Sequence, residues 1–275
     1  MSGFMKLYAH ARHMHVLSPR LLHLQATTAA QCKRLLHACL LFSRRASSTG
    51  VIANDWLFRP LASDVDITVP TYIKDHVACE LERFREHRKP KTTSSVVPSG
   101  VLVPLCVCND RLSLLYTRRT SNVTSHRRQV SFPGGMYEEG DVDLVRTALR
   151  ETEEEIGIDR SSIDVWGNMP RMMASGRKSA VPVVGFVGNV TLDELKTNRD
   201  EVESVFAVSL LRLSDPLLRV TTKFRQRYEM PVFLGGQYRV WGLTAIITDY
   251  LLHVLCGAEI ASRNIQSICW DDRQK

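Results

Sequence analysis

The most regular alternation of apolar and polar positions in this 275-residue chain lies near its middle. Apolar side chains recur there at the spacing of one helix face, at Leu144, Val145, Ala148, Leu149 and Ile156. This periodicity predicts an amphipathic α-helix. Asp141 or Asp143 is placed to cap its start, and Gly157 stands where a helix commonly ends.

The rest of the chain mixes strand and helix patterns. Tyr72 to His87 predicts a second amphipathic helix, and the Pro- and Ser-containing residues 88–100 indicate a linker. Val101 to Cys108 and Leu112 to Thr117 flank the turn residues Asn109-Asp110, which is typical of a β-hairpin. Further expected elements are strand segments within 131–133, 163–166, 181–187, 198–210, 231–234 and 239–241, and a helix over 243–255. This mixture predicts an α/β sandwich.

Three glutamates crowd the last turn of the central helix. Glu151, Glu154 and Glu155 stand at positions i, i+3 and i+4, so they share a face with Cβ atoms about 5–6 Å apart. Carboxylates are unfavourable at the negative end of a helix dipole. Their accumulation there indicates a divalent cation, since Mg²⁺ takes oxygen ligands from a few carboxylates together with water and phosphate. The alternative is a solvated face, which is the commoner meaning of a run of charge.

The order of residues around these glutamates favours the metal site. Residues 150–158 read Arg-Glu-Thr-Glu-Glu-Glu-Ile-Gly-Ile, and Gly134-Gly135 stand upstream. This pattern resembles the Nudix box, the signature of Mg²⁺-dependent hydrolases that cleave a nucleoside diphosphate linked to another moiety. The preceding Phe132-Pro133, and a gap from Asp141 to Arg150 one residue longer than usual, are similar to the coenzyme A diphosphatase branch in its animal mitochondrial form. The resemblance implies an α-β-α sandwich with a mixed sheet.

The resemblance extends over about residues 101–256 and implies roles for particular side chains. The implied metal ligands are Glu151, Glu154 and Glu155, with Mg²⁺ or Mn²⁺ as the cofactor. The implied catalytic residues are Arg150, which would steady a carboxylate, Glu154, and Glu201, which would be an outer ligand or general base. The implied substrate-binding residues are Arg119, His126, Gln129, Ser131, Gly134 and Gly135. The chain departs from residues common in the branch at Thr124, Arg128, Met136 and Ser209.

Some of these residues also have ordinary structural explanations. Asp141 is expected to cap the helix rather than to pair with Arg150. Gly134-Gly135 would permit a close approach of the backbone to the helix, although a simple turn is the commoner reason for such glycines. Asp249 and His253 share a face of the last helix, and we interpret them as a surface pair.

The positive charge of the chain is concentrated at its N-terminus. The net charge is +7, yet residues 1–54 contain seven Lys and Arg and no Asp or Glu, so the remainder is formally neutral. A neutral remainder lacks the basic footprint of a nucleic-acid-binding protein. An acid-free segment rich in Arg, His, Leu and Ala is typical of an organellar transit peptide. A secretory signal and a disordered basic tail are the alternatives, and the apolar run Leu35 to Phe42 is too short to span a bilayer.

Together these observations predict a mitochondrial hydrolase that cleaves the diphosphate of coenzyme A and acyl-coenzyme A. The products would be phosphopantetheine species and adenosine 3′,5′-bisphosphate. The predicted regions are a transit peptide at 1–48, a helix and linker at 49–100, the hydrolase domain at 101–260 and a tail at 261–275. A hydrolase of NADH or ADP-ribose and a catalytically idle nucleotide sensor are the alternatives. The seven cysteines contain no C-x-x-C pair, which argues against a zinc ribbon. No membrane span or nucleic-acid partner is expected, and both monomer and homodimer stay open.

Overall fold

The computed structural model describes residues 57, 69, 71–86, 97–121, 127–174, 178–224, 228–256 and 266–268. The predicted transit peptide, most of the predicted linker and the residues Thr124 and His126 lie outside this part of the chain. Within it, no helix is long and apolar enough to cross a membrane.

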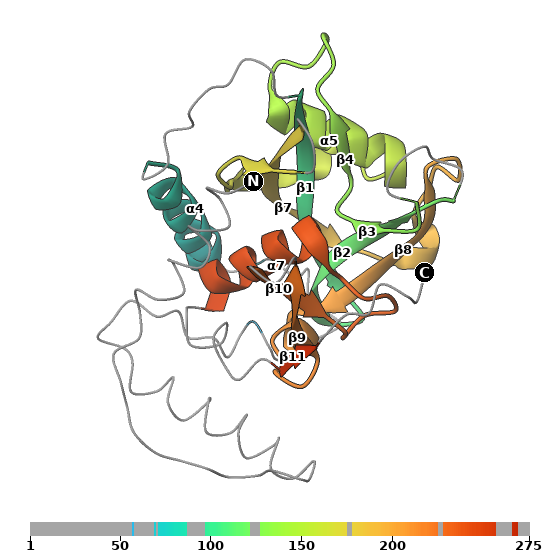
Figure 1. Cartoon of the computed structure of the whole chain (residues 1–275). Helices are drawn as coiled ribbons and strands as arrows, with labels where there is room; N and C mark the ends of the chain where they lie inside the picture. The colour runs from blue at the N-terminus through green and yellow to red at the C-terminus, as the bar shows by residue number, and fades with distance from the viewer. Residues whose placement is uncertain are drawn as a thin grey trace.

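The elements of the first half lead up to the central helix (Figure 1). They are α4 (Thr71–Glu86), β1 (Val97–Cys108), β2 (Arg111–Arg119), β3 (Val130–Ser131), β4 (Gly134–Met136) and α5 (Leu144–Ile156). The elements that follow are η1 (Arg160–Ser162), β5 (Asp164–Asn168), β6 (Met172–Met173), β7 (Lys178–Asn189), η2 (Leu192–Glu194), β8 (Val202–Ser209), α6 (Leu210–Leu213), β9 (Arg219–Phe224), β10 (Tyr228–Phe233), α7 (Gly242–Cys256) and β11 (Gln266–Ile268). All three predicted helices, which correspond to α4, α5 and α7, and the predicted hairpin are confirmed.

The main sheet is mixed, as predicted. Its strands run in the order β3-β2-β1-β7-β5, with β4 paired to β1, β6 to β7 and β8 to β2. The β1–β7 pair is parallel, whereas β1 pairs with β2 and β4 in antiparallel fashion. The turn between β1 and β2 has left-handed φ values of 50° at Asn109 and 57° at Asp110. Two positive φ angles are the mark of the tight hairpin turn whose twist matches the strands.

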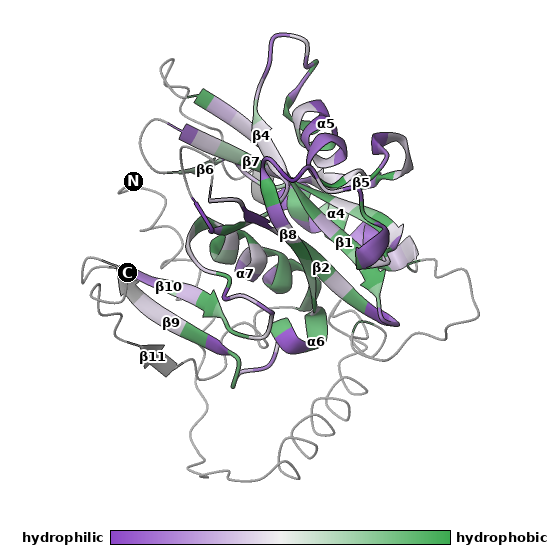
Figure 2. Ribbon diagram, turned by 90° about the vertical axis from the view of Figure 1, so that its right-hand side faces the viewer, coloured by the Kyte–Doolittle hydropathy of each residue, from purple (hydrophilic) through white to green (hydrophobic). Residues whose placement is uncertain are grey.

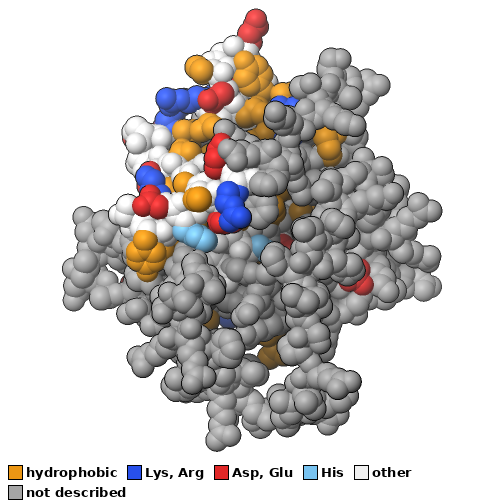
Figure 3. Space-filling view, turned by 90° about the vertical axis from the view of Figure 1, so that its left-hand side faces the viewer, with side chains coloured by type: hydrophobic (Ala, Val, Ile, Leu, Met, Phe, Trp, Pro, Cys, Tyr) orange, Lys and Arg blue, Asp and Glu red, His pale blue; other side chains and the backbone are white. Residues whose placement is uncertain are grey.

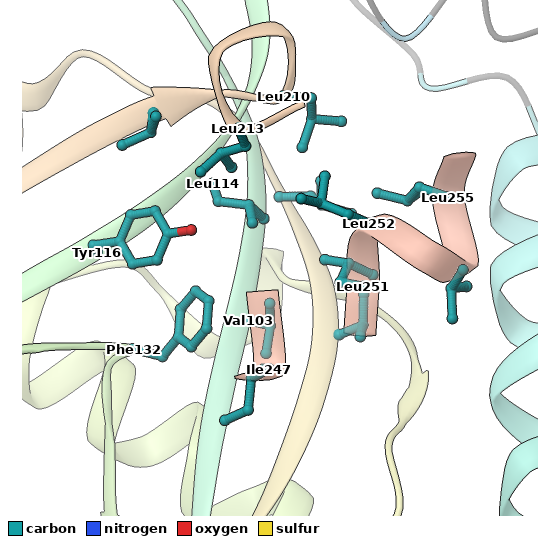
Figure 4. Close-up of a cluster of buried hydrophobic side chains, with 14 of the residues drawn as sticks. Val103, Leu114, Tyr116, Phe132, Leu210, Leu213, Ile247, Leu251, Leu252 and Leu255 are labelled. Atoms are coloured by element: carbon teal, nitrogen blue, oxygen red, sulfur yellow. The ribbon is translucent and has the colours of Figure 1, made fainter. Parts of the chain in front are cut away.

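Successive side chains of β1 point to opposite faces of this sheet and supply two cores. Val103, Leu105 and Val107 pack in the core that also contains buried residues of α4 and α7, whereas Leu102 and Cys106 pack in the core beneath α5. Figure 4 shows Val103 beside residues of α7, and Figure 2 shows the apolar character of the central strands and α7. Helices therefore cover both faces, which makes the fold an α-β-α sandwich.

The fold differs from the sequence predictions in several places. Residues 97–100 belong to β1 rather than to a linker, and a Cβ on Gly100 would lie 2.1 Å from the carbonyl oxygen of Leu144. The segment 239–241 makes only an isolated bridge, between Val240 and Phe233. Strand β9 was not predicted, and it forms a separate three-stranded sheet with β10 and β11. Its composition explains the omission, because Arg219, Thr221, Thr222 and Lys223 break the apolar pattern.

The interpretation of Asp249 and His253 as a surface pair is wrong. The Asp249 side chain is fully buried and forms an ion pair with Arg219, whose side chain is 2% exposed. His253 Nδ1 lies 2.7 Å from the backbone oxygen of Asp249 and 3.9 Å from its carboxylate. The Arg219 guanidinium also lies over the ring of Phe233, 5.5 Å from its centroid. This pair fixes the second sheet against α7.

Removing one member of that pair is expected to destabilise the fold strongly. Asp249→Ala would leave the Arg219 charge buried without its carboxylate, at a cost of about 3–5 kcal/mol in the free energy of unfolding. Urea denaturation measures this loss. The control is Lys74→Ala, which removes an exposed pair with Asp164 at 2.7 Å and is expected to cost less than about 1 kcal/mol. Equal, small losses for both variants would contradict the structural role of the buried pair.

Candidate active site

Helix α5 is held at both ends by its own sequence. The side chain of Asp143 accepts a hydrogen bond from the backbone N–H of Arg146 at 2.8 Å, so Asp143 and not Asp141 is the N-cap. Gly157 ends the helix with φ 74°, a conformation that favours glycine. The buried residues of α5 include Ala148, Leu149 and Ile156, which face the sheet. The apolar stripe therefore fixes the rotation of the helix and hence the direction of its glutamates.

Glu155 is the most deeply buried of these glutamates. Its residue exposure is only 3%, its Oε2 accepts a hydrogen bond from the N–H of Gly134 at 3.3 Å, and its Oε1 lies 3.7 Å from Arg119 Nη1. Burial raises the pKa of Glu155 to about 8; Arg119 opposes this shift, and the nearby Glu151 and Glu201 add to it. A carboxylate in this setting has little solvent to stabilise its charge, so it favours a proton or a cation.

Glu151 and Glu201 lie near Glu155, and their charges disfavour the charged form of Glu155. Burial is the main reason that the pKa of Glu151 is raised, and Glu201 contributes in the same direction. The backbone of Glu201 is anchored on both sides, because its carbonyl accepts from Thr120 N–H at 2.9 Å and its N–H donates to the Asn198 carbonyl at 3.2 Å. Asn198 N–H in turn donates to the carbonyl of Glu155 at 2.9 Å. The loop before β8 is thus tied to the end of α5.

The two glycines are required for a close backbone approach and not for a simple turn. They lie in β4, which pairs with β1. A Cβ on Gly134, where φ is 147°, would lie 2.4 Å from the Gly100 oxygen and 2.5 Å from Val101 Cα. A Cβ on Gly135 would lie 2.3 Å from the nearest carboxylate oxygen of Glu151. Gly134 therefore serves the pairing of strands, whereas Gly135 makes room for a site carboxylate.

Arg150 is the centre of an ion-pair network beside these carboxylates. Its Nε and Nη2 donate to the two carboxylate oxygens of Asp141 at 3.0 and 3.1 Å, and its Nη1 donates to Glu154 at 3.0 Å. Nη2 also lies 3.2 Å from Glu151 Oε1. These contacts place Arg150 where it can steady carboxylates, which stays a prediction of its role. The preference for Asp141 as a cap was wrong. Arg150 holds the pKa of Asp141 well below its usual range.

Thr147 is a part of this network that the sequence reasoning missed. Its hydroxyl donates to Asp141 Oδ2 at 2.8 Å, and Glu138 N–H donates to the same oxygen at 3.1 Å. The available signal was a threonine three residues after Leu144, a spacing that places both on one side of the helix. In the structure Thr147 is fully buried. The residue fixes Asp141, and Asp141 fixes Arg150.

Glu154 does not join Glu151 and Glu155 in the structure. Its side chain is 52% exposed and turns to Arg150. In the described part of the chain, no three His, Cys, Asp or Glu side chains are gathered closely enough to hold an ion as they stand. The donor chemistry nevertheless fits a divalent cation, since Glu151, Glu155 and Glu201 offer hard oxygen atoms. Burial raises the pKa values of Glu151 and Glu155, so both carboxylates lack the solvent that would otherwise stabilise their charge.

The predicted substrate-binding residues are only partly brought together. Arg119 lies against Glu155 and Gly134 donates to it. The carbonyl of Gln129 accepts from Arg119 N–H at 3.1 Å. Ser131 Oγ lies 3.0 Å from Thr117 Oγ1 across the β2–β3 pair. His126 lies outside the described residues, and neighbouring Arg128 has a left-handed φ of 54°, the conformation that favours glycine.

Comparison with known proteins agrees with this geometry. The model of the NUDIX domain matches residues 98–228. The mitochondrial coenzyme A diphosphatase NUDT8 of Mus musculus is 42% identical over 192 residues, which cover 66% of this chain and 91% of that protein. The chain belongs to the Nudix family.

Other relatives of this chain, and a solved structure similar to it, also have names that identify them as Nudix proteins. NUDT8 of Homo sapiens is 43% identical over 162 residues, which cover 57% of this chain and 69% of that protein. Nudix hydrolase 3 of Caenorhabditis elegans is 33% identical over 178 residues, covering 57% and 72%. Among solved structures, a MutT/nudix family protein from Enterococcus faecalis is 15% identical with a TM-score of 0.41, covering 71% of this chain and 81% of that one. As a Nudix hydrolase, the protein uses a divalent metal ion.

A methyl group at Gly135 is expected to damage the site of this Nudix hydrolase without unfolding it. Gly135→Ala would displace the Glu151 carboxylate, whereas Gly140→Ala is the matched control, because a Cβ there has no neighbour within 4 Å. We expect weaker Mn²⁺ binding in calorimetry for Gly135→Ala, a change in stability within about 1 kcal/mol, and no effect of Gly140→Ala. Unchanged Mn²⁺ affinity in Gly135→Ala would show that Glu151 is not a ligand.

Burial of Glu155 also predicts how stability depends on pH in the metal-free protein. Its pKa is about 8 in the folded chain, against a reference of 4.5. The folded state therefore binds this proton more tightly than the unfolded state, and stability falls as pH rises from the lower value through the higher one. We expect urea denaturation to show a loss on the order of a few kcal/mol between about pH 5 and 8. Glu155→Gln should remove most of this dependence of stability on pH, whereas the control Glu153→Gln should keep it. The same dependence in both variants would contradict the assignment.

Proposed function

We propose that this Nudix protein hydrolyses the diphosphate bond of coenzyme A and acyl-coenzyme A. The observation that carries the proposal is the row of Glu155 and Glu151 set against Gly134 and Gly135 in a chain 42% identical to a coenzyme A diphosphatase. The products would be phosphopantetheine species and adenosine 3′,5′-bisphosphate. One phosphorus–oxygen bond of the bridge breaks, and a water molecule supplies the new oxygen.

The proposed cofactor is Mg²⁺ or Mn²⁺, and the proposed ligands are Glu151 and Glu155 with Glu201 as an outer ligand or base. Glu154 would join them by leaving Arg150. When bound, such an ion neutralises charge on the diphosphate oxygens and lowers the pKa of bound water. Oxygen ligands and several carboxylates are what these cations require.

The residues of the chain then have distinct tasks. Arg119 lies at the edge of the buried carboxylate, with a side chain 24% exposed, where its guanidinium can bind a diphosphate oxygen. Glu201 would accept a proton from the attacking water, and its backbone is held by hydrogen bonds with Thr120 and Asn198. Arg150 is a positioning residue, because its donors are directed at Asp141, Glu151 and Glu154.

The proposed location is the mitochondrion. The support is the acid-free, basic composition of residues 1–54 and the mitochondrial names of the two NUDT8 relatives. This location would place the enzyme in contact with a matrix pool of acyl-coenzyme A.

Product analysis tests the proposed reaction. The full chain with Mg²⁺ or Mn²⁺ is incubated with coenzyme A, octanoyl-coenzyme A, NADH and ADP-ribose, and products are separated by chromatography. We expect adenosine 3′,5′-bisphosphate from the two coenzyme A substrates and a loss on the order of a hundredfold or more in Glu155→Gln, as when a group that stabilises developing charge is removed. Glu153→Gln is the matched control, because Glu153 pairs with Arg160 away from the site.

Other outcomes of this experiment assign other functions. Preference for NADH or ADP-ribose would show that the enzyme hydrolyses another nucleoside diphosphate derivative rather than coenzyme A. Absence of hydrolysis on every substrate, with nucleotide binding retained in calorimetry, would indicate a sensor.

A further inference from the structure

The turn that carries Glu201 lies near the carboxylates of α5. The charge of Glu201 raises the pKa values of Glu151 and Glu155, an effect that acts over a few ångströms. Glu201 is far from both glutamates in the sequence. Contacts between separate elements must therefore place it beside the helix.

The segment before this turn crosses the C-terminal end of α5. Leu195 packs against the core beneath the helix. A Cβ on Gly157 would lie 2.7 Å from the Lys196 Cβ and 3.0 Å from the Lys196 carbonyl oxygen. Asn198 N–H then donates to the Glu155 carbonyl at 2.9 Å, which belongs to the last turn of the helix, where carbonyl groups lack partners within the helix. The glycine that ends α5 thus also lets this segment lie directly on the helix.

Asn198 closes the turn with its side chain as well as with its backbone. Its Oδ1 accepts from the N–H of Asp200 at 3.1 Å. Its carbonyl accepts from the N–H groups of Glu201 at 3.2 Å and of Val202 at 2.9 Å. An asparagine side chain that binds the backbone two residues further on is a common way to fix a turn. The Asn198 side chain therefore restricts the backbone immediately before Glu201.

Thr120 holds the same turn from the end of β2. Its hydroxyl donates to the Asp200 carbonyl at 3.0 Å, and its N–H donates to the Glu201 carbonyl at 2.9 Å. The residue is 7% exposed, and it directly follows Arg119, whose Nη1 lies 3.7 Å from Glu155 Oε1. One threonine thus binds the carbonyl groups on both sides of the Glu201 Cα atom.

We propose that Thr120 and Asn198 are positioning residues, which hold Glu201 beside the carboxylates of α5 before metal and substrate bind. This assignment rests on the proposed hydrolytic function, in which Glu201 accepts the proton of the attacking water. A general base must lie within hydrogen-bond reach of the proton that it takes, and a displacement of about 1 Å can cost about a hundredfold in rate. Asp200 is exposed, so water can replace a lost partner of its backbone. Loss of either side-chain bond should therefore loosen the turn without unfolding the protein.

Substitutions of the two side chains test their role in catalysis. Thr120→Val keeps the shape of threonine and removes its hydroxyl, and Asn198→Ala removes the Oδ1 acceptor. With coenzyme A and Mg²⁺, each should lower kcat about tenfold with little change in KM, because the turn places the base and not the substrate. Thr120→Ser, which keeps the hydroxyl, should recover most of the kcat that is lost in Thr120→Val.

A double-mutant cycle shows whether the two residues act through Glu201. Glu201→Gln removes the proposed base. Adding Thr120→Val or Asn198→Ala to Glu201→Gln should then lower kcat by less than about a further twofold, because residues that act as a unit are not additive. A further loss of about tenfold in that background would overturn the proposal, since it would not depend on the base.

Hydrogen exchange tests the held turn without any hydrolysis. In the metal-free protein, the amides of Asp200 and Glu201 should exchange about fivefold faster in Thr120→Val and Asn198→Ala than in the wild type and Thr120→Ser, as the loss of one hydrogen bond implies. Equal exchange in all four proteins would overturn the proposal. Faster exchange in the variants of a protein that hydrolyses no coenzyme A would support the positioning of Glu201 and contradict only the proposed function.

A side-chain contact on another side of the molecule supplies the control. The side that bears α4 faces the viewer in Figure 3, where basic and acidic side chains lie next to one another. Lys74 of α4 donates to Asp164 of β5 at 2.7 Å. Lys74→Ala removes a contact between two elements, as the test variants do, and should leave kcat and the exchange of the Asp200 and Glu201 amides unchanged. Changes as large as those of Thr120→Val would overturn the proposal, because any loosening of the fold would then move the turn.

Discussion

Burial of the Glu155 carboxylate beneath the backbone of β4 is the constraint on which the site depends. The Gly134 N–H reaches this carboxylate only because β4 runs close along α5. That approach requires residues without side chains, since a Cβ on either glycine would meet backbone or carboxylate atoms. The packing of α5, the pairing of β4 and the burial of the Glu155 carboxylate therefore depend on one another. A shift of α5 by one turn would separate all three.

The sheet makes this arrangement rigid from the other side. Gly100 of β1 allows the first turn of α5 to lie directly on the strand, and β1 itself pairs with β2, β4 and β7. Arg119 comes from the end of β2, and Glu201 comes from the loop tied to the end of α5 through Asn198. Groups from three separated parts of the sequence thus meet at one end of the sheet. Their positions are fixed by backbone hydrogen bonds rather than by long, flexible side chains.

The parts of this structure that could be predicted are those with local signals. The periodicity of α5, its end at Gly157 and the turn at Asn109-Asp110 all follow from residues close together in the sequence. A metal site at the glutamates was predicted because carboxylates at the negative end of a helix dipole are unfavourable. A local arrangement that costs stability often accompanies function. The resemblance to the Nudix box implied that the glycines bind substrate, and the residues themselves left a turn or a close approach open. The structure shows the close approach.

The parts that could not be predicted depend on partners distant in sequence. Nothing local shows that Asp249 meets Arg219 thirty residues earlier, and a polar β9 gives no strand signal. Asp141 was assigned to the wrong role for a related reason. Asp141 and Asp143 both precede the helix, and only the folded position of Arg150 shows which one caps it and which one forms the ion pair.

The arrangement of charge around α5 suggests why Glu154 and Glu155 differ so much in burial. A buried carboxylate next to Glu151 and Glu201 is unstable as an anion, so it holds a proton until a cation replaces that proton. Glu154 stays exposed and paired with Arg150, where its charge costs little. In the proposed site, a cation would take the place of that proton, and Glu154 would leave Arg150 to bind it. The network around Arg150 then keeps its remaining partner, Asp141, which Thr147 and the Glu138 N–H hold in place. The geometry of the helix is thus set by packing and by the Arg150 network, and a bound divalent ion would balance the charge of the carboxylates.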